Sequence, residues 1–175
     1  MILTIRNIVS IIKAQWVGQN ETAIVDSISI DSRSLQNDEN TLFFALYGPN
    51  HDGHLFIEEL IAKGVSHFVV RKIPEGLELK AKFLIVEDTL DALQKFAAYY
   101  RSQFDFPIIG ITGSNGKTII KEWLNFLLSP DYNIIRSPKS YNSQVGVPLS
   151  ILGINEKHNL GIFEAGISQM HEMDK

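Results

Sequence analysis

A glycine-rich loop near the middle of the chain has the residue types needed to bind nucleotide phosphates. It follows the hydrophobic run 106–111 and consists of Thr112, Gly113, Ser114, Asn115, Gly116, Lys117 and Thr118. Glycine has no Cβ, so the backbone at positions 113 and 116 can turn its N–H groups toward an anion. Lys117 would place a positive charge on the β- and γ-phosphates, and Thr118 would offer a hydroxyl to Mg²⁺. These residues predict a nucleoside triphosphate site.

The loop is a variant of the usual phosphate-binding pattern. The strict pattern has its first glycine at position 111, where this chain has Ile111, with glycines at 110 and 113 instead. A helix is predicted from Thr118 to about Leu128, and its N-terminus would face the anion. The alternative is an exposed strand-to-helix turn with an ordinary surface lysine. We favour the phosphate site because strand, loop and helix occur in the required order.

An acidic residue further along the chain could complete this site. Residues 107–164 alternate strand, helix, strand, helix and strand, which is typical of a parallel sheet with a nucleotide at the carboxyl ends of its strands. The last strand, near residues 160–163, leads directly into Glu164. An acid that leaves a strand beside a phosphate loop is well placed to hold Mg²⁺. The alternative is a solvated glutamate at a strand end.

The hydrophobic patterns predict an α/β protein with two domains, residues 1–105 and 106–175. The first would be a small mixed α/β domain, and the second the start of a parallel-sheet ATPase domain with a P-loop. In the first domain we expect helices over 4–16, 54–63 and 88–104, and strands over 24–30, 41–46, 67–71 and 83–86. Thr4 and Asp88 would cap the first and last helices, with Asp91 in the capping-box position. The boundary is predicted at Phe106.

Composition excludes several classes of protein. The chain has 175 residues, of which 45% are hydrophobic and 21% charged, and it contains no cysteine. It therefore has no disulfide framework, no cysteine nucleophile and no cysteine-based zinc site. A net charge of −4 provides no basic surface for nucleic acid. No apolar run approaches the length of a membrane span, and the N-terminus lacks the features of a signal peptide. We expect a soluble cytoplasmic enzyme.

Three other groups of polar residues could belong to a functional site, but each also has a purely structural explanation. Asp31 to Arg33 could be a turn at a strand end in which the two charged side chains pair. Asn142, close to a glycine and a proline, could serve only loop geometry. His51 and His54 have the spacing of metal ligands, but no third ligand is evident in the sequence.

Several segments together resemble the Mur ligases of bacterial cell-wall synthesis. They are residues 111–118 (ITGSNGKT), 141–148 (YNSQVGVP) and 164–166 (EAG), preceded by residues 31–33 (DSR), 41–46 (TLFFAL) and 48–54 (GPNHDGH). The segments span almost the whole chain. Within the family, the chain is most similar to the branch that adds D-alanyl-D-alanine to UDP-N-acetylmuramoyl-tripeptide. The segment YNSQ is also similar to fused proteins in which an alanine racemase follows the ligase.

The resemblance implies roles for individual residues. Gly113 to Thr118 would bind ATP, and Glu164 would help hold Mg²⁺. Asn142 would contribute to the catalytic cleft together with Lys117 and Glu164. Four residues match positions near the uridine diphosphate of the substrate: Ser32, Arg33, Asn50 and His51. The family usually has asparagine where this chain has Ser143, and glycine where it has His171.

The implied reaction is the formation of an amide bond driven by ATP, through an acyl phosphate. The resemblance also implies that the chain is the N-terminal part of a longer ligase, whose C-terminal domains would bring the second substrate. Two alternatives remain open. One is another amino-acid ligase of the same superfamily, of the Mur or folylpolyglutamate type. The other is a nucleotide-binding module without catalysis.

Overall fold

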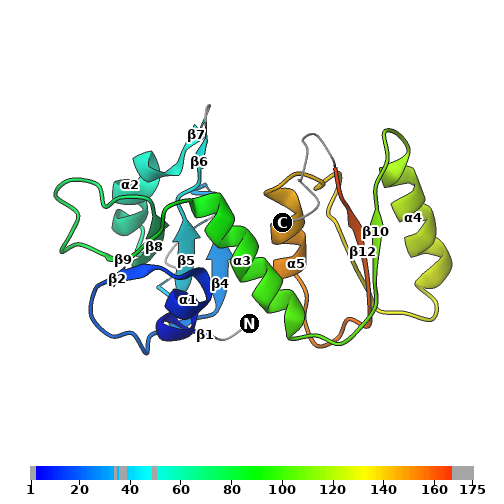
Figure 1. Ribbon diagram of the computed structural model, residues 1–175, viewed down its shortest axis with the longest axis horizontal. Coiled ribbons are helices and arrows are strands. Elements are labelled where there is room, and N and C mark those ends of the chain that lie inside the picture. Colours follow the sequence, from blue (N-terminus) through cyan, green and yellow to red (C-terminus); the bar gives the residue numbers. More distant parts are fainter. Residues whose placement is uncertain (1–2, 34, 36–38, 49–50, 167–175) are drawn as a thin grey trace. The chain divides into compact units, whose positions relative to one another are not determined.

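Strands predominate over residues 15–52, and helices and strands alternate from residue 89 onward (Figure 1). The computed structural model describes residues 3–33, 35, 39–48 and 51–166. The chain divides into two compact units, residues 1–96 and 97–175. This division lies within helix α3 (Thr89–Ser102), so the domain boundary predicted at Phe106 stays a prediction.

Unit 1 is built on a five-stranded sheet with the strand order β2-β9-β8-β5-β4. The four strands β4, β5, β8 and β9 are parallel, and β2 is antiparallel to β9. The elements are β1 (Leu3–Thr4), α1 (Ile5–Ile12), β2 (Gln15–Val17), β3 (Ile24–Val25), β4 (Ser27–Ser29), β5 (Thr41–Phe44), β6 (Tyr47–Gly48), β7 (His51–Asp52), the 3-10 helix η1 (Gly53–Phe56), α2 (Ile57–Ala62), β8 (His67–Val70) and β9 (Lys82–Ile85). The predicted mixed α/β character of this region is confirmed.

Both faces of this sheet are covered by helices. Side chains that alternate along the strands face α2 on one side, where Phe43, Phe68 and Phe83 pack with Ile57 and Leu60. On the other side Phe44 contacts Phe96 of α3, with a ring-centroid distance of 6.3 Å. The central strands β5 and β8 are therefore buried along their whole length.

The first helix is shorter than predicted. Thr4 caps α1 as expected, because its hydroxyl accepts a hydrogen bond from the backbone N–H of Asn7 at 3.3 Å. The helix ends at Ile12, since Lys13 adopts a left-handed conformation with φ of 52°. The residues up to Trp16 that the sequence assigned to the helix instead turn into β2 and pair with β9.

The cap of α3 is confirmed, and the capping-box role of Asp91 stays a prediction. The carboxylate of Asp88 accepts hydrogen bonds from the backbone N–H groups of Leu90 at 2.7 Å and Asp91 at 3.1 Å. The side chain of Asp91 pairs with Lys95 at 2.6 Å, one turn further along.

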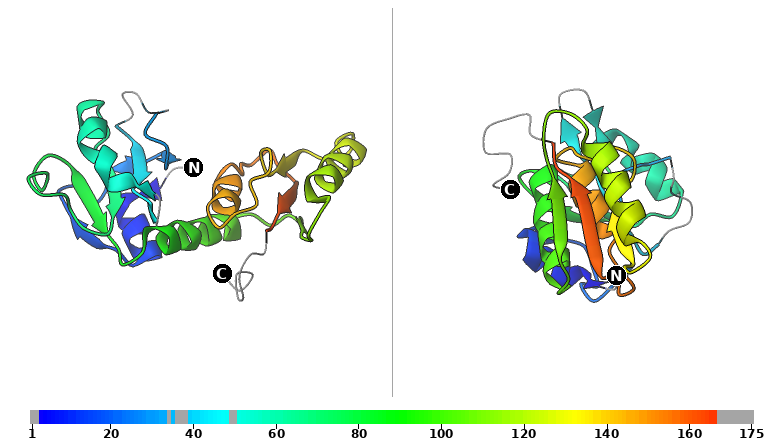
Figure 2. Two further views of the ribbon diagram at one scale, coloured as in Figure 1. Left: turned by 90° about the horizontal axis from the view of Figure 1, so that it is seen from above. Right: turned by 90° about the vertical axis from the view of Figure 1, so that its right-hand side faces the viewer.

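Unit 2 contains a three-stranded parallel sheet in the order β10-β12-β11. Its elements are β10 (Ile108–Ile111), α4 (Lys117–Leu128), β11 (Ile134–Arg136), α5 (Gly146–Leu152) and β12 (Leu160–Glu164). Figures 1 and 2 show α4 and α5 on opposite faces of this sheet. The predicted strand–helix alternation and parallel sheet are confirmed. Within the described ranges, no helix has both the length and the apolar character that a membrane crossing requires.

A buried histidine in unit 1 makes its stability depend on pH. His67 begins β8 and is 3% exposed. Burial, together with the charge of Lys82, lowers the pKa of His67 from 6.5 to about 4. The unfolded chain therefore binds more protons between these pH values. The contribution of the neutral imidazole to the unfolding free energy is fully present above pH 6.5 and is lost as the pH falls toward 4.

We expect the unfolding free energy of unit 1 to fall by about 3 kcal/mol over this pH range because of His67 alone. A His67→Leu variant removes this titration while keeping an apolar side chain at the buried site. Urea unfolding at several pH values should therefore show a smaller pH dependence for the variant than for the parent chain. Equal slopes for the two proteins would contradict the assignment.

Candidate functional site

The phosphate loop has backbone conformations that favour glycine. Gly113 has φ of 137° and Gly116 has φ of 80°, both in the region that side chains with a Cβ rarely adopt. Gly116 immediately precedes the first residue of α4, Lys117. The two glycines thus let the chain turn sharply from β10 into the N-terminus of the helix, as the sequence predicts.

Lys117 and Thr118 lie at the start of α4. The ammonium of Lys117 donates a hydrogen bond to the carbonyl oxygen of Gly113 at 2.5 Å, which holds the side chain over the loop. The hydroxyl of Thr118 donates to Oε2 of Glu164 at 3.1 Å. The loop threonine and the strand-end acid are therefore in direct contact, as required if both are to hold one metal ion.

The strand register explains this contact. In the parallel pair of β10 and β12, Ile111 lies opposite Glu164. The loop leaves β10 directly after Ile111, so the acid at the end of β12 lies beside it. Glu164 is fully buried, and its backbone N–H donates to the hydroxyl of Ser137 at 3.0 Å. The alternative of a solvated strand-end glutamate is wrong.

A buried lysine is the main feature of the site that sequence reasoning missed. Lys121 has no exposed surface, and its Nζ lies 2.8 Å from Oε1 of Glu164. Its ammonium also donates to the carbonyl oxygens of Ser137, at 2.9 Å, and Lys139. The signal in the sequence was its position one helical turn after Lys117, which places both lysines on the same face of α4.

The geometry at Thr118 and Glu164 fits Mg²⁺. Adjacent ligands of octahedral Mg²⁺, with metal–oxygen distances of 2.0–2.1 Å, lie about 2.9–3.0 Å apart. The hydroxyl of Thr118 and Oε2 of Glu164 are 3.1 Å apart. In the described part of the chain, no three His, Cys, Asp or Glu side chains are placed to hold a metal. The ion would therefore also need phosphate oxygens and water, as Mg²⁺ at nucleotide sites usually does.

Asn142 lies close to the end of β12. Its backbone carbonyl accepts a hydrogen bond from the N–H of Gly166 at 2.8 Å, and a Cβ on Gly166 would lie 2.9 Å from that oxygen. This contact connects two of the segments on which the family resemblance rests. Ser143, where the family usually has asparagine, accepts a hydrogen bond from the N–H of Gly146 at the start of α5. The catalytic role of Asn142 stays a prediction, and His171 lies outside the described residues.

The predicted substrate-binding residues of unit 1 follow the carboxyl ends of two neighbouring strands, β4 and β5. Ser32 and Arg33 come shortly after β4. The guanidinium of Arg33 donates to both carboxylate oxygens of Asp31, at 2.9 and 2.7 Å, and these bonds lower the pKa of Asp31 to about 2. The alternative of a turn with paired charges is therefore confirmed, while a role in substrate binding stays a prediction.

His51 and Asn50 belong to the segment that follows β5. The imidazole of His51 stacks on Phe56 with a centroid distance of 6.2 Å. Asn50 lies outside the described residues. His54 does not join His51 in a metal site: its Nδ1 pairs with Asp52 at 2.8 Å, and its Nε2 accepts from the N–H of Arg71 at 3.0 Å.

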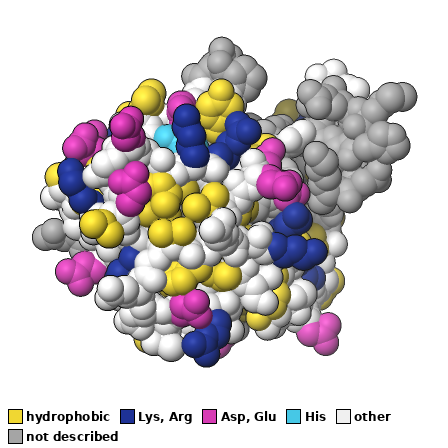
Figure 3. Space-filling view, turned by 60° about the vertical axis from the view of Figure 1, so that its left-hand side comes forward, with side chains coloured by type: hydrophobic (Ala, Val, Ile, Leu, Met, Phe, Trp, Pro, Cys, Tyr) yellow, Lys and Arg dark blue, Asp and Glu magenta, His cyan; other side chains and the backbone are white. Residues whose placement is uncertain are grey.

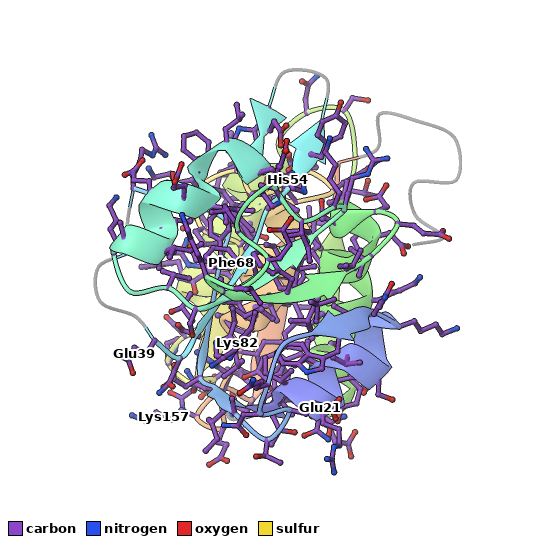
Figure 4. The ribbon with its side chains drawn as sticks, turned by 90° about the vertical axis from the view of Figure 1, so that its left-hand side faces the viewer. Glu21, Glu39, His54, Phe68, Lys82 and Lys157 are labelled. Carbon is purple, nitrogen blue, oxygen red and sulfur yellow. The ribbon has the colours of Figure 1, made fainter. Side chains whose placement is uncertain are left out.

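A pocket of about 600 Å³ lies at this edge of unit 1, around His54, which is labelled in Figure 4. The guanidinium of Arg71 lies 4.9 Å from the ring centroid of Tyr47 at its wall. Burial alone would raise the pKa of Asp52, but its hydrogen bonds with His54 outweigh burial and lower it. The lining residues are Tyr47, Asp52, His54, Arg71, Lys72, Val86 and Glu87. Among the described residues, those predicted from the sequence to bind substrate, Ser32, Arg33 and His51, do not line this pocket.

Charges of both signs are mixed on the surface. On the face drawn in Figure 3, Lys and Arg side chains alternate with Asp and Glu, and hydrophobic side chains lie between them. Neither sign of charge dominates this face.

The fold and the loop–acid pair of unit 2 define a nucleotide-binding protein of the P-loop type. Residues 111–175 match the middle domain of the Mur ligases, and residues 24–101 match the catalytic domain of the Mur ligase family. The chain belongs to the Mur ligase family.

Individual relatives agree with this assignment. The chain is 32% identical over 173 residues to the UDP-N-acetylmuramoyl-tripeptide–D-alanyl-D-alanine ligase of Bacillus subtilis, covering 98% of this chain and 37% of that protein. A structure of the D-alanyl-D-alanyl-adding ligase of Acinetobacter baumannii superimposes with a TM-score of 0.87 and 27% identity, covering 99% of this chain and 38% of that one. MurF ligase of Thermotoga maritima in complex with ADP has a TM-score of 0.72 and 29% identity, covering 84% and 33% of the two chains.

The chain thus spans little more than a third of the length of these relatives. The matched relatives give no support for a fused alanine racemase. The predicted fold class is confirmed by the match to the N-terminal and middle domains of such ligases.

Proposed function

We propose that this chain is the sugar-nucleotide-binding and ATP-binding part of a cytoplasmic ligase that adds D-alanyl-D-alanine to UDP-N-acetylmuramoyl-tripeptide in peptidoglycan synthesis. The observation that carries the proposal is the contact between Thr118 and Glu164 beside Lys117. Similarity to ligases of this substrate specificity supports the choice of substrate.

The first chemical step would be phosphoryl transfer. A carboxylate oxygen of the tripeptide attacks the γ-phosphorus of ATP, the bond between the β–γ bridging oxygen and the γ-phosphorus breaks, and ADP leaves. The loop N–H groups and Lys117 hold the phosphates and offset the repulsion between the two anions. Mg²⁺, held by Thr118 and Glu164, would supply further positive charge to the phosphate oxygens.

The second step would be capture of the acyl phosphate by an amine. The neutral amino group of D-alanyl-D-alanine attacks the acyl carbon, the tetrahedral intermediate expels phosphate and gives up the amine proton, which the released phosphate can take up, and an amide bond remains. Residues that hold the carboxylate in line with the γ-phosphate provide much of the rate, because they replace a random encounter by a fixed orientation. We propose that Asn142 belongs to this group, on the basis of its contact with Gly166 two residues after Glu164.

In this proposal, neither unit binds the second substrate, D-alanyl-D-alanine. We therefore expect the 175-residue chain alone to bind nucleotides without ligase activity. ADP release that depends on D-alanyl-D-alanine would contradict this expectation.

Unit 1 would hold the UDP end of the substrate, at the segments that contain Ser32, Arg33, Asn50 and His51. Calorimetric titration with UDP-N-acetylmuramoyl-tripeptide tests this, with UMP and Mg·ATP titrated separately. We expect saturable binding that Arg33→Ala weakens about tenfold, ~1.4 kcal/mol, because a guanidinium can bind a diphosphate through two hydrogen bonds. Arg6→Ala is the matched control, since Arg6 is an exposed arginine of the same unit that pairs with Glu21.

The outcomes separate the alternatives. If the folded chain does not bind the UDP ligand but binds Mg·ATP, the folylpolyglutamate type of ligase or a nucleotide-binding module replaces the proposal. If Mg²⁺ fails to tighten nucleotide binding, the module without catalysis is favoured. If Arg6→Ala weakens binding as much as Arg33→Ala, the effect is not specific to the predicted segment.

A further inference from the structure

Lys121 connects three elements of unit 2 from a position with no contact to solvent. Its ammonium donates hydrogen bonds to the carbonyl oxygens of Ser137, at 2.9 Å, and Lys139, which follow β11. It also lies 2.8 Å from Oε1 of Glu164, at the end of β12. A lysine is rarely buried completely, because removing an ammonium from water is costly unless it is paired and hydrogen-bonded. The site provides those partners.

The two carboxylate oxygens of Glu164 are held from different sides. Oε1 faces Lys121 as a close ion pair without the alignment of a hydrogen bond, and Oε2 accepts from the hydroxyl of Thr118. The backbone N–H of Glu164 is fixed in addition by Ser137. These contacts restrict rotation of the carboxylate. Oε2 is therefore directed toward Thr118 without help from a metal or a nucleotide.

We propose that Lys121 is a positioning residue: it holds Glu164 so that Oε2 and the hydroxyl of Thr118 form a preformed binding site for a divalent cation. This inference rests on the proposed function, in which the site binds Mg²⁺ with a nucleotide. Lys121 acts through Glu164 and contacts neither ligand. Charge alone would have the opposite effect, because an ammonium next to a cation site repels the cation. Removing the ammonium of Lys121 should therefore weaken cation binding if Lys121 positions Glu164. It should tighten cation binding if only the charge of Lys121 matters.

The test compares Lys121→Met with Lys157→Met in the 175-residue chain. Lys157 is an exposed lysine of the same unit, so its replacement makes the same change in charge away from the site (Figure 4). Mn²⁺ binding in the presence of ADP is measured by electron paramagnetic resonance. We expect Lys121→Met to weaken Mn²⁺ binding at least about tenfold, with ADP affinity in the absence of metal unchanged and Lys157→Met equal to the parent. Unchanged or tighter Mn²⁺ binding by Lys121→Met would overturn the proposal.

A double-mutant cycle tests whether Lys121 acts through Glu164. In a Glu164→Gln background, Lys121→Met should cause no further loss of Mn²⁺ affinity. The double variant should also unfold at a higher urea concentration than Lys121→Met alone, because no unpaired buried carboxylate remains. An equal loss of Mn²⁺ affinity in both backgrounds would show that Lys121 does not work through Glu164.

If Lys121→Met does not fold, a chemically modified Lys121→Cys variant replaces it in the test. The chain has no cysteine, so Lys121→Cys can be modified at that single site in the unfolded state. Alkylation with bromoethylamine restores an ammonium, whereas iodoacetamide adds a neutral group. We expect only the ammonium adduct to recover Mn²⁺ binding after refolding, and equal affinities of the two adducts would overturn the proposal.

One outcome concerns the proposed function alone. If the parent chain binds neither ADP nor Mn²⁺ with ADP, the proposed function of the chain is contradicted. A crystal structure of Lys121→Met then decides the positioning role separately. A carboxylate of Glu164 still within hydrogen-bond distance of the Thr118 hydroxyl in that structure would overturn it.

Discussion

A Lys117→Ala variant is expected to bind Mg·ADP about 100-fold more weakly than the parent chain, a loss of ~2.7 kcal/mol. The ammonium lies over the loop, hydrogen-bonded to Gly113, and a nucleotide phosphate would replace that carbonyl with an anionic acceptor. Hydrogen bonds between charged groups contribute more than neutral ones, so the loss should be large. The measurement is calorimetric titration of both proteins with ADP at saturating Mg²⁺.

Two controls define this result. Lys157→Ala removes an exposed lysine of the same unit and should leave ADP binding unchanged. Lys117→Arg keeps the charge but replaces a compact ammonium with a planar group, so it should recover only part of the affinity. A Lys117→Ala chain that binds Mg·ADP like the parent would refute the assignment of this loop as a phosphate site.

The second large effect concerns the core of unit 1. Phe68 is fully buried in β8, stacked on Phe83 at a centroid distance of 5.8 Å and edge-on to Phe43 at 6.2 Å, and Figure 4 shows it in the interior. We expect Phe68→Ala to lower the unfolding free energy of this unit by about 3–5 kcal/mol, since it removes both ring contacts and leaves a cavity. Leu79→Ala, at a fully exposed leucine, should change it by less than about 0.5 kcal/mol.

The two tryptophans allow the units to be followed separately. Trp16 lies in β2 of unit 1 and Trp123 in α4 of unit 2. In a Trp123→Phe background, tryptophan fluorescence during urea unfolding reports on unit 1 alone. An unchanged midpoint for Phe68→Ala in that background would show that the aromatic cluster does not stabilise the sheet.

Local signals in the sequence were sufficient for the elements around the predicted phosphate site. The hydrophobic run before the loop, the glycines within it and the helical period after it all depend on neighbouring residues, so β10 and α4 begin and end close to the predicted positions. The strand that ends at Glu164, β12, was predicted for the same reason. These features follow from backbone geometry that a short segment determines by itself.

Features that depend on distant partners were missed. The apolar pattern around Trp16 continues the helical period of α1, but pairing with Leu84 in β9 draws this residue into a strand. Lys121 reads as an ordinary polar position on a helix, because its burial depends on carbonyl groups that follow β11 and on an acid at the end of β12. The pocket around His54 is formed by residues from several strand ends, and no single segment of the sequence contains it.

The order β10-β12-β11 also affects when the sheet of unit 2 can form during synthesis. Of these three strands, β12 leaves the ribosome last, and it lies between the two earlier ones, which share no hydrogen bonds with each other. At about 5–20 residues per second, the stretch between Arg136 and Leu160 takes on the order of seconds to emerge. Until then β10 and β11 lack β12, the strand with which each of them pairs in the described part of the chain. The phosphate loop therefore acquires its supporting strand and its acid in a single late event, when β12 inserts between them.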